Sequence, residues 1–362
     1  MKKLYSLFIL IGLAPCLLAQ TPANVELVYT EASTLTLTGK LIDTPNPYHR
    51  VDTVKFKGFT RGENIQVRNS SGIGVSFKTN SSIISIITEY GDIGRPTNTG
   101  GISARGYDLY IRKDGKWLWA AAGVAGDANL DKPYTLIRNM DRTEKECLLY
   151  LPLYSEERSI KIGVEKGATL EAAPNPFRYR IGIFGSSYTH GSSTGRAGMA
   201  YPAIFSRNTG LQLLSLGCSG NCKLQDYFAN VLAAADVDAF MFDTFSNPTP
   251  EQIRERLFPF IEKIQAAHPG KPLIFQQTIY RESRNFNGGS DKSEGDRIAV
   301  ADSLMKIACK KYKDVYFIHP NATARNHEAS IDGVHPSNYG YQIWAESIEK
   351  PVKKILRKYG IK

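Results

Sequence analysis

The first half of the chain has the short alternation of hydrophobic and polar positions that is typical of β-strands. Runs such as Ser33–Thr38, Ser82–Thr88 and Lys161–Val164 are rich in β-branched residues, and clusters of Gly, Asn, Asp and Pro separate them. Many short strands at close spacing indicate two antiparallel sheets packed face to face. We therefore predict an all-β sandwich domain over residues 20–173, which ends at an Ala-Ala-Pro-Asn-Pro segment.

A hairpin is predicted at residues 107–120. Two strand-like runs flank an Asp-Gly pair there, and this dipeptide accepts the positive φ angles of a tight turn. Side chains alternate along a strand, so Tyr107 and Leu109 face one side of the sheet while Asp108 and Tyr110 face the other. We expect the Tyr107 side to pack into the core.

From residue 178 onward the pattern changes to hydrophobic strands that alternate with helical segments. The strand-like runs are Ile181–Phe184, Leu213–Leu216, Ala239–Phe242, Leu273–Phe275 and Val315–Ile318. Strands that are hydrophobic throughout are typical of a parallel sheet covered on both faces. The predicted fold class for residues 178–362 is therefore α/β, a five-stranded parallel sheet flanked by helices.

One of the predicted helices has a clear start signal. Thr249 and Gln252 form a capping box, and Pro250 occupies the first helical position. A hydrophobic stripe at helical spacing follows, made of Ile253, Leu257, Phe260, Ile261 and Ile264. We expect this stripe to pack against the sheet.

Residues 1–19 belong to neither pattern. Two lysines precede an apolar run, and the segment ends on the small residue Ala19. This is the organisation of a secretory signal peptide, so we expect an exported protein, periplasmic or secreted. Cys16 raises the alternative of a lipoprotein, although Pro15 stands where a small residue is usual. No later run approaches the ~20 apolar residues of a membrane-spanning helix, so no membrane span is expected.

Composition excludes some classes of partner. The chain of 362 residues has a formal net charge of +10, and the positive residues are spread along it without a basic cluster of the kind that binds nucleic acid. Nucleic acid is therefore not an expected partner. No cofactor or metal is expected either, because no histidine lies near Cys218 and Cys222, the two cysteines that are close together in sequence.

Four cysteines lie beyond the leader. Cys218 and Cys222 are close enough in sequence to bridge, and the sequence leaves open whether they do. Cys147 falls in a strand-like run and Cys309 in a helical pattern, so we expect both to be buried free thiols.

Three residues offer the chemistry of an activated serine. Ser187 directly follows the first α/β strand, and parallel sheets bind ligands beyond the carboxyl ends of their strands. Asp332 and His335 lie three residues apart, so both can face the same way. A serine hydroxyl becomes a good nucleophile when an imidazole takes its proton and a carboxylate orients that imidazole. The sequence therefore predicts a triad of Ser187, His335 and Asp332.

The segments after the next two strands offer hydrogen-bond donors. The second strand is followed by Gly-Cys-Ser-Gly-Asn at 217–221, and the third by Asp-Thr-Phe-Ser-Asn-Pro at 243–248. Backbone amides of a glycine loop and the side-chain amide of an asparagine are donors that can stabilise the oxyanion of acyl transfer. Each segment taken alone is equally compatible with a plain turn.

In this order along the chain, the four blocks resemble the SGNH (GDSL-type) hydrolases over residues 178 to about 350. The resemblance implies that Ser187 is the nucleophile, His335 the base and Asp332 its orienting partner. It also implies an oxyanion hole made by the amides of Ser187 and Gly220 and the side chain of Asn247.

The chain departs from the family pattern at two positions. Ser186 stands where the family has aspartate, which places two serines side by side; Ser187 is preferred because Gly-x-Ser-x-Thr then fits Gly185 and Thr189. Pro248 follows Asn247, where the family has aspartate.

A second resemblance concerns the N-terminal half. Residues 106–110 match the Gly-x-Asp-Leu-Tyr signature of a β-domain that precedes the catalytic domain in some exported SGNH hydrolases. This arrangement is similar to that of carbohydrate esterases that remove acetyl groups from plant polysaccharides, which implies an acylated carbohydrate as substrate. Tyr188, His190 and Arg196, which lie close to the nucleophile in sequence, are candidates for contact with it.

Two alternatives stay open. The same fold serves esterases and lysophospholipases that act on lipid acyl chains. A glycan-binding protein whose hydrolase domain has lost activity is the other alternative, and the altered positions Ser186 and Pro248 are its motivation.

Overall fold

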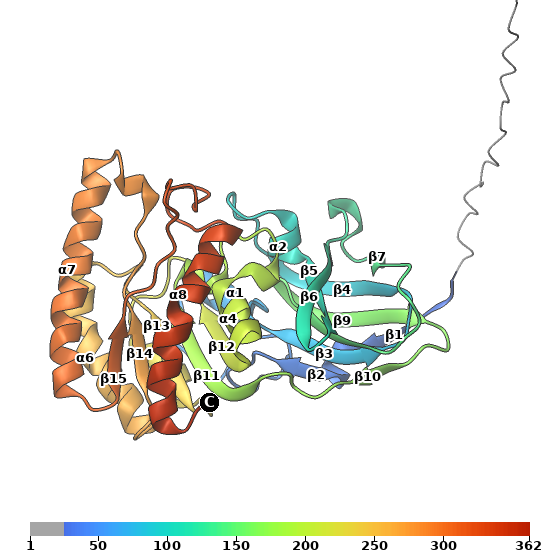
Figure 1. The fold of residues 1–362 in the computed structure, drawn as a ribbon, viewed down its shortest axis with the longest axis horizontal. Helices are drawn as coiled ribbons and strands as arrows, with labels where there is room; N and C mark the ends of the chain where they lie inside the picture. Colours follow the sequence, from blue (N-terminus) through green and yellow to red (C-terminus); the bar gives the residue numbers. More distant parts are fainter. Residues whose placement is uncertain (1–24) are drawn as a thin grey trace, which may run out of the picture.

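The computed structural model describes residues 25–362. The predicted leader at residues 1–19 and Cys16 lie outside the described residues. A unit built mainly of β-strands is followed by an α/β unit, as Figure 1 shows. The fold class predicted from the sequence, a β-sheet domain followed by a five-stranded parallel α/β domain, is confirmed.

The N-terminal unit consists of two antiparallel sheets. Its strands are β1 (Leu27–Glu31), β2 (Thr36–Thr38), β3 (Gly74–Thr79), β4 (Ile84–Ile93), β5 (Tyr107–Lys113), β6 (Lys116–Gly123), β7 (Tyr134–Ile137), β8 (Lys145–Tyr150), β9 (Ser155–Glu165) and β10 (Leu170–Ala172). One sheet has the order β1-β9-β4-β7, and the other has the order β10-β3-β8-β5-β6, with β2 paired to β3. Phe77 and Leu149 of the second sheet meet Ile86 and Ile162 of the first in a fully buried core.

The predicted hairpin is present, and two helices of this unit were not predicted. Asp114 and Gly115 of the β5–β6 turn have φ angles of 51° and 75°, as the Asp-Gly pair indicates. The missed helices are α1 (Arg61–Arg68) and α2 (Gly101–Arg105). α1 starts with a capping box, but Val67 is its only buried hydrophobic residue, so no periodic stripe marks it in the sequence.

The C-terminal unit is a three-layer α/β structure. Its strands are β11 (Arg178–Gly185), β12 (Leu211–Gly217), β13 (Ala239–Asp243), β14 (Leu273–Gln276) and β15 (Val315–Ile318). Its α-helices are α3 (Ser187–His190), α4 (Tyr201–Thr209), α5 (Asp226–Ala233), α6 (Pro250–Ala267), α7 (Gly288–Lys311) and α8 (Asn338–Leu356). Short 3₁₀ helices occur in both units: Ala32–Thr34 and Asp127–Asn129 in the N-terminal one, and Ala197–Met199, Glu282–Arg284 and Arg357–Tyr359 in the C-terminal one.

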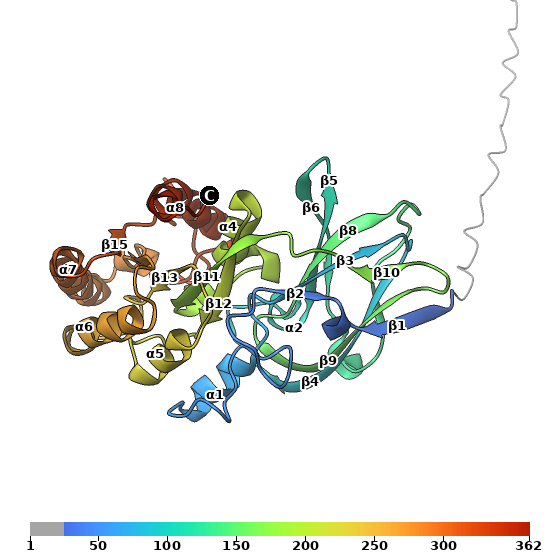
Figure 2. The same cartoon turned by 90° about the horizontal axis from the view of Figure 1, so that it is seen from below.

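All five strands are parallel, in the order β12-β11-β13-β14-β15. Helices α4 and α8 cover one face of the sheet, and α5, α6 and α7 cover the other (Figure 2). The capping box of Thr249 and Gln252 opens α6, and the five predicted stripe residues of this helix are all buried.

The two units share hydrophobic contacts. Leu41, Val51 and Val67 of the N-terminal half are buried in the same cluster as Phe184 and Phe228 of the α/β unit. Arg50 is fully buried beside them and donates to the Gly217 carbonyl at 2.8 Å, at the end of β12. A buried guanidinium that is hydrogen-bonded across this boundary fixes the N-terminal unit against a strand that leads into the predicted site.

The four cysteines of residues 25–362 are all free, so Cys218 and Cys222 do not bridge. Cys147 is buried as expected, but the expectation was wrong for Cys309, which is exposed. On α7 the adjacent Ala308 faces the core, and each helical step turns the side chain by about 100°, which carries Cys309 to the solvent side.

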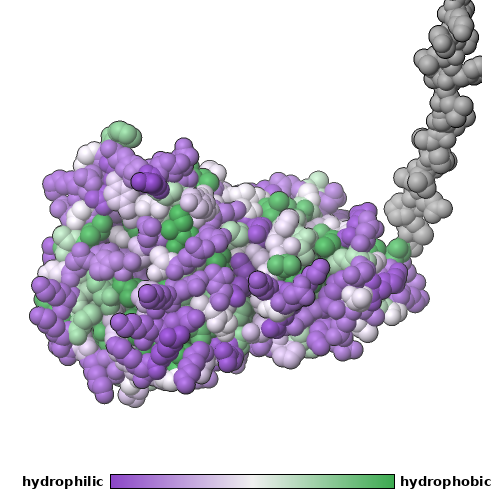
Figure 3. All heavy atoms as spheres, viewed as in Figure 1, coloured by the Kyte–Doolittle hydropathy of each residue, from purple (hydrophilic) through white to green (hydrophobic). Residues whose placement is uncertain are grey.

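Over the same residues, no helix is both long and apolar enough to cross a membrane. Hydrophilic residues cover most of the face drawn in Figure 3, and hydrophobic residues form small separate groups on it.

Candidate active site

The predicted site residues leave the sheet along one edge. In the strand register, Gly185 at the end of β11 lies opposite both Gly217 of β12 and Asp243 of β13. The loops that follow these three adjacent strands carry Ser187, Gly220 and Asn247. Because the strands are parallel, their carboxyl ends bring the three loops to the same edge.

Ser187 is the first residue of the short helix α3. Ser186 is its N-cap, and the Ser186 hydroxyl accepts from the Tyr188 amide at 3.2 Å. A Cβ at Gly185 would collide with Thr189 Oγ1, so the sharp change from strand to helix requires glycine at this point. The turn holds the Ser187 side chain at the strand end, where 7% of the residue is exposed.

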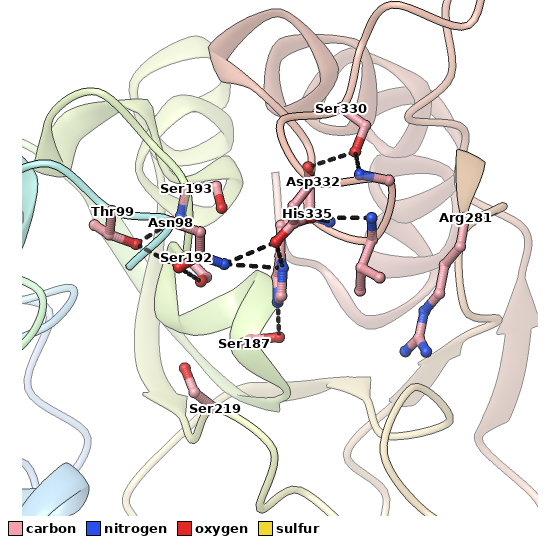
Figure 4. A network of polar contacts seen from close by, with 12 residues as sticks. Asn98, Thr99, Ser187, Ser192, Ser193, Ser219, Arg281, Ser330, Asp332 and His335 are labelled. Atoms are coloured by element: carbon pink, nitrogen blue, oxygen red, sulfur yellow. Dashed lines mark hydrogen bonds and ion pairs between the residues drawn. The ribbon is translucent and has the colours of Figure 1, made fainter. Parts of the chain in front are cut away.

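Ser187, His335 and Asp332 form a continuous hydrogen-bond chain (Figure 4). Ser187 Oγ lies 2.9 Å from His335 Nε2, and His335 Nδ1 lies 2.8 Å from Asp332 Oδ2. With the proton on Nδ1, the ring donates to the carboxylate and can accept the serine proton at Nε2. The three side chains thus have the order that a serine nucleophile needs.

The loop before α8 holds Asp332 and His335 in position. Ser330 pairs with Pro336 in an isolated β-bridge, and the Ile331 amide donates to the His335 carbonyl at 2.9 Å. Gly333, at the tip, has a φ of 81° and donates to Ser330 Oγ at 2.9 Å. The closed loop places the Asp332 and His335 side chains on the same side of the loop, where they contact each other and Ser187.

Asp332 is held as a carboxylate. Partial burial acts to raise its pKa, but hydrogen bonds from the Asn98 side chain, from the amide and ring of His335 and from the Val334 amide outweigh that effect. The pKa of Asp332 is therefore well below its usual range. A carboxylate that stays charged is the partner that an imidazole base needs.

The neighbouring serine faces another group. Ser186 Oγ donates to Asp243 Oδ2 at 2.8 Å, and the Ser186 amide donates to the same oxygen at 3.1 Å. Thr189 and Ser246 hydroxyls donate to this carboxylate as well, at 3.0 and 3.1 Å. Burial raises the pKa of Asp243 to about 6, since these bonds offset only part of the desolvation. The contacts of Ser186 are those of a turn-stabilising residue.

The two further oxyanion candidates lie on linked loops. Gly220 has a φ of 72°, and a Cβ at this position would meet no other atom within 4 Å. Asn247 Oδ1 accepts from the Cys222 amide at 3.3 Å, which leaves the side-chain NH₂ group as the free donor. Ser187 contributes the first amide of α3, a position without an intrahelical acceptor. These donors have the chemistry that an oxyanion hole requires.

Tyr188 supports the imidazole. Its side chain has no exposed surface, and its ring lies edge-on to His335 with centroids 5.6 Å apart. Its hydroxyl accepts from Arg281 Nε at 2.8 Å, and Arg281 in turn pairs with Glu294 at 2.8 Å. Burial raises the pKa of Tyr188 to about 12. The substrate contact predicted for this residue does not fit a side chain buried in this way.

His190 is a buried contact between the units. It has no exposed surface, stacks on Tyr154 at 4.2 Å and lies with Nε2 2.6 Å from the Leu153 carbonyl. Its other nitrogen lies 3.2 Å from Ser219 Oγ. Burial lowers the pKa of His190 well below its ordinary value, so the ring is neutral. The predicted substrate contact does not fit His190 either.

Arg196 also faces the N-terminal unit. Its Nη1 donates to the two oxygens of Asp108 at 3.0 and 2.8 Å and to the Tyr110 hydroxyl at 2.6 Å. The Gly198 amide donates to the same carboxylate at 2.8 Å. The Asp and Tyr of the Gly-x-Asp-Leu-Tyr signature are therefore anchors for the α/β unit, and the predicted substrate contact of Arg196 gives way to this role.

The sequence analysis missed Asn98 and Arg281. Asn98 comes from the loop between β4 and α2, and its amide donates to Asp332 Oδ2 at 2.9 Å (Figure 4). No motif surrounds it, and it is distant in sequence from the residues that it contacts. Arg281 follows β14, the fourth strand, and only its place after a strand end gives a signal.

This fold, with a serine, an imidazole and a carboxylate in hydrogen-bond contact at the strand ends, is that of a serine hydrolase. A family model described as the GDSL-like lipase/acylhydrolase family matches residues 178–353. A second model, described as the N-terminus of SGNH hydrolase-type esterases, matches residues 27–170.

Solved structures extend the comparison to the whole chain. A GDSL-like lipase from Bacteroides ovatus is 36% identical, with a TM-score of 0.88, over 92% of this chain and 98% of that one. A salicylyl-acyltransferase from a tetracycline biosynthetic pathway has a TM-score of 0.69 at 19% identity, over 92% of this chain and 98% of that one. An acetyl xylan esterase from the rumen bacterium Butyrivibrio proteoclasticus has a TM-score of 0.53 at 12% identity, over 91% and 99%.

A search of curated proteins returned no match. The chain belongs to the GDSL-like lipase/acylhydrolase family, and it is a carboxylester hydrolase.

Proposed function

We propose that this protein is an exported esterase that removes small acyl groups, above all acetyl, from carbohydrate. The observation that carries the proposal is the chain of hydrogen bonds from Ser187 through His335 to Asp332. These hydrogen bonds also argue against the alternative of a glycan-binding protein without activity. Ser186 departs from the family pattern, but its hydroxyl contacts Asp243 and leaves the Ser187–His335–Asp332 hydrogen bonds intact.

The proposed reaction has two acyl-transfer steps. Ser187 Oγ attacks the ester carbonyl while His335 Nε2 takes the hydroxyl proton, and His335 then gives that proton to the departing sugar oxygen. Water attacks the acyl-serine in the second step, again with His335 as base, and releases the acid. In both steps the amides of Ser187 and Gly220 and the Asn247 side chain would stabilise the oxyanion.

The surroundings of the nucleophile support a small acyl group and a hydroxyl-rich substrate. Ser192, Ser193 and Ser219 lie around Ser187 and His335 in Figure 4, together with Asn98. A site for long acyl chains needs a contiguous apolar channel, where each buried methylene adds about 0.8 kcal/mol. The similarity to the acetyl xylan esterase concerns the fold, and it agrees with a carbohydrate substrate without establishing one.

Two measurements test the proposal. Hydrolysis of a chromogenic acetyl ester by the wild-type protein, compared with Ser187→Ala, separates an enzyme from a binding protein. Acetate release from a panel of acetylated polysaccharides then tests the substrate class, and absence of release from every member, with the chromogenic ester still hydrolysed, would refute the carbohydrate assignment. Export is tested separately by locating the protein in its cells and sequencing its mature N-terminus.

A further inference from the structure

The hydrogen-bond chain of the active site continues into the N-terminal unit. Asn98 Nδ2 lies 2.9 Å from Asp332 Oδ2 and 3.2 Å from His335 Nδ1. Asp332 Oδ2 is also the oxygen that faces His335 Nδ1, at 2.8 Å. Two donors, one from each unit, therefore converge on one carboxylate oxygen, as Figure 4 shows.

The contacts on its other side fix the orientation of the Asn98 amide. Asn98 Oδ1 lies 3.2 Å from Thr99 Oγ1 and 3.4 Å from Ser192 Oγ, and both hydroxyls can donate to it. The reversed amide would turn its oxygen toward the Asp332 carboxylate, where two acceptors would oppose each other. Asn98 therefore acts as a donor to Asp332.

The loop that carries Asn98 is tied to the segment that follows the nucleophile helix. The Ser193 amide donates to Thr99 Oγ1 at 3.0 Å, and the hydroxyls of Ser103 and Thr194 lie 2.7 Å apart. All four of these residues are buried. Hydrogen bonds of this kind on both sides hold a side chain in one rotamer, which a positioning role requires.

We propose that Asn98 is a positioning residue of the active site, which holds Asp332 in place as the acceptor for the imidazole. By occupying one acceptor direction of Oδ2, its amide keeps the carboxylate from rotating and keeps His335 Nε2 aimed at Ser187. The N-terminal unit thus supplies part of the catalytic machinery. This inference rests on the proposed role of Ser187 as nucleophile, and it is independent of the substrate class.

The test uses a small organophosphonate, which reports the reactivity of Ser187 without any carbohydrate, together with the chromogenic acetyl ester. We expect Asn98→Ala to lower kcat and the labelling rate by about tenfold with little change in KM. We also expect the pH of half-maximal labelling to rise. Without the hydrogen bond from Asn98, the negative charge of Asp332 interacts more strongly with His335 and favours the imidazolium form. Asn98→Asp keeps the size and adds a negative charge, so it should raise that pH further, by about 1 unit.

The other groups that face His335 are the same in all of these variants. They are Asp332 from its own loop, Tyr188 from α3, and Arg281, which donates to Tyr188. The control is Thr97→Ala, an exposed neighbour in the same loop, which should leave both the rate and the pH midpoint unchanged. Thermal melting of each variant checks that it is folded. If Asn98→Ala does not fold, the comparison with the wild type is made with Asn98→Asp alone.

The outcomes separate the two proposals. If the wild type is labelled at Ser187 and the Asn98 variants match it, the inference is overturned alone. It is equally overturned if both variants lose rate at an unchanged pH midpoint, since Asn98 then only shapes the loop. If the wild type is not labelled at Ser187, the proposed nucleophile is wrong and the inference falls with it.

Discussion

Arg196 binds Asp108 through one guanidinium nitrogen that reaches both carboxylate oxygens, at 3.0 and 2.8 Å. The Asp108 side chain is 1% exposed, and Arg196 comes from the segment between the nucleophile helix and α4. The guanidinium also lies 5.3 Å from the ring centre of Tyr110 and 5.1 Å from that of Trp119. The Gly-x-Asp-Leu-Tyr signature therefore acts as a structural contact between the units.

We expect Asp108→Ala to destabilise the protein by about 3–5 kcal/mol, because it leaves Arg196 without its buried partner. Urea unfolding of the variant measures the loss. The matched control is Asp296→Ala, which breaks an exposed pair with Lys292 and should cost about 1 kcal/mol or less. Equal losses in the two variants would contradict the anchoring role.

The two adjacent serines should respond differently to substitution. Ser187→Ala should lower hydrolysis of an acetyl ester at least about 10³-fold and abolish organophosphonate labelling. Ser186→Ala should keep its label on Ser187 but lose about 1 kcal/mol of stability, since it removes the N-cap of α3. Peptide mapping of the labelled protein decides the matter, and an adduct on Ser186 would reverse the assignment.

Asp243 should make stability fall as the pH rises. Its pKa is raised from 3.8 to about 6 in the folded protein, so between these values the unfolded chain loses its proton first. The contribution is therefore fully present below pH 3.8 and lost as the pH passes about 6, a change on the order of 3 kcal/mol. Asp243→Asn has no such ionisation, and urea midpoints of both proteins from pH 4 to 7 should diverge accordingly; parallel curves would refute the shift.

Acyl-chain length should separate a deacetylase from a lipid esterase. On synthetic esters, kcat/KM should fall from two carbons to eight, because polar side chains such as Ser192 and Asn98 lie beside the nucleophile (Figure 4). A site that buried the six additional methylenes would gain about 0.8 kcal/mol from each. Octanoate turnover equal to or better than acetate turnover would favour the lipid alternative.

The sequence predicted those features that depend on local pattern. The five strands of the α/β unit follow from hydrophobic runs. The contact of Ser187 with His335 follows from the place of Ser187 at a strand end and from the three-residue spacing of Asp332 and His335. Helix α1 escaped because a capping box without a hydrophobic stripe is a weak signal.

Contacts between the two units could not be predicted from the local sequence pattern. His190 and Arg196 are adjacent to the nucleophile in sequence, yet α3 and the turn after it direct both toward the N-terminal unit. Asn98 lies in the other half of the chain, and only the tertiary structure shows that it meets Asp332. Closeness in sequence was therefore a poor guide to which residues line the site.

The hydrophobic cluster that joins Leu41, Val51 and Val67 to Phe184 has a consequence for how such proteins diversify. An exchange of the N-terminal half for an unrelated β-domain would leave this surface of the α/β unit uncovered and would remove the hydrogen bond from Asn98 to Asp332. We therefore expect the two halves to change together, although each is recognisable by itself in sequence. Changes that adapt the enzyme to a new ester are expected in the loops around the strand ends, and compensating pairs of changes at the shared cluster.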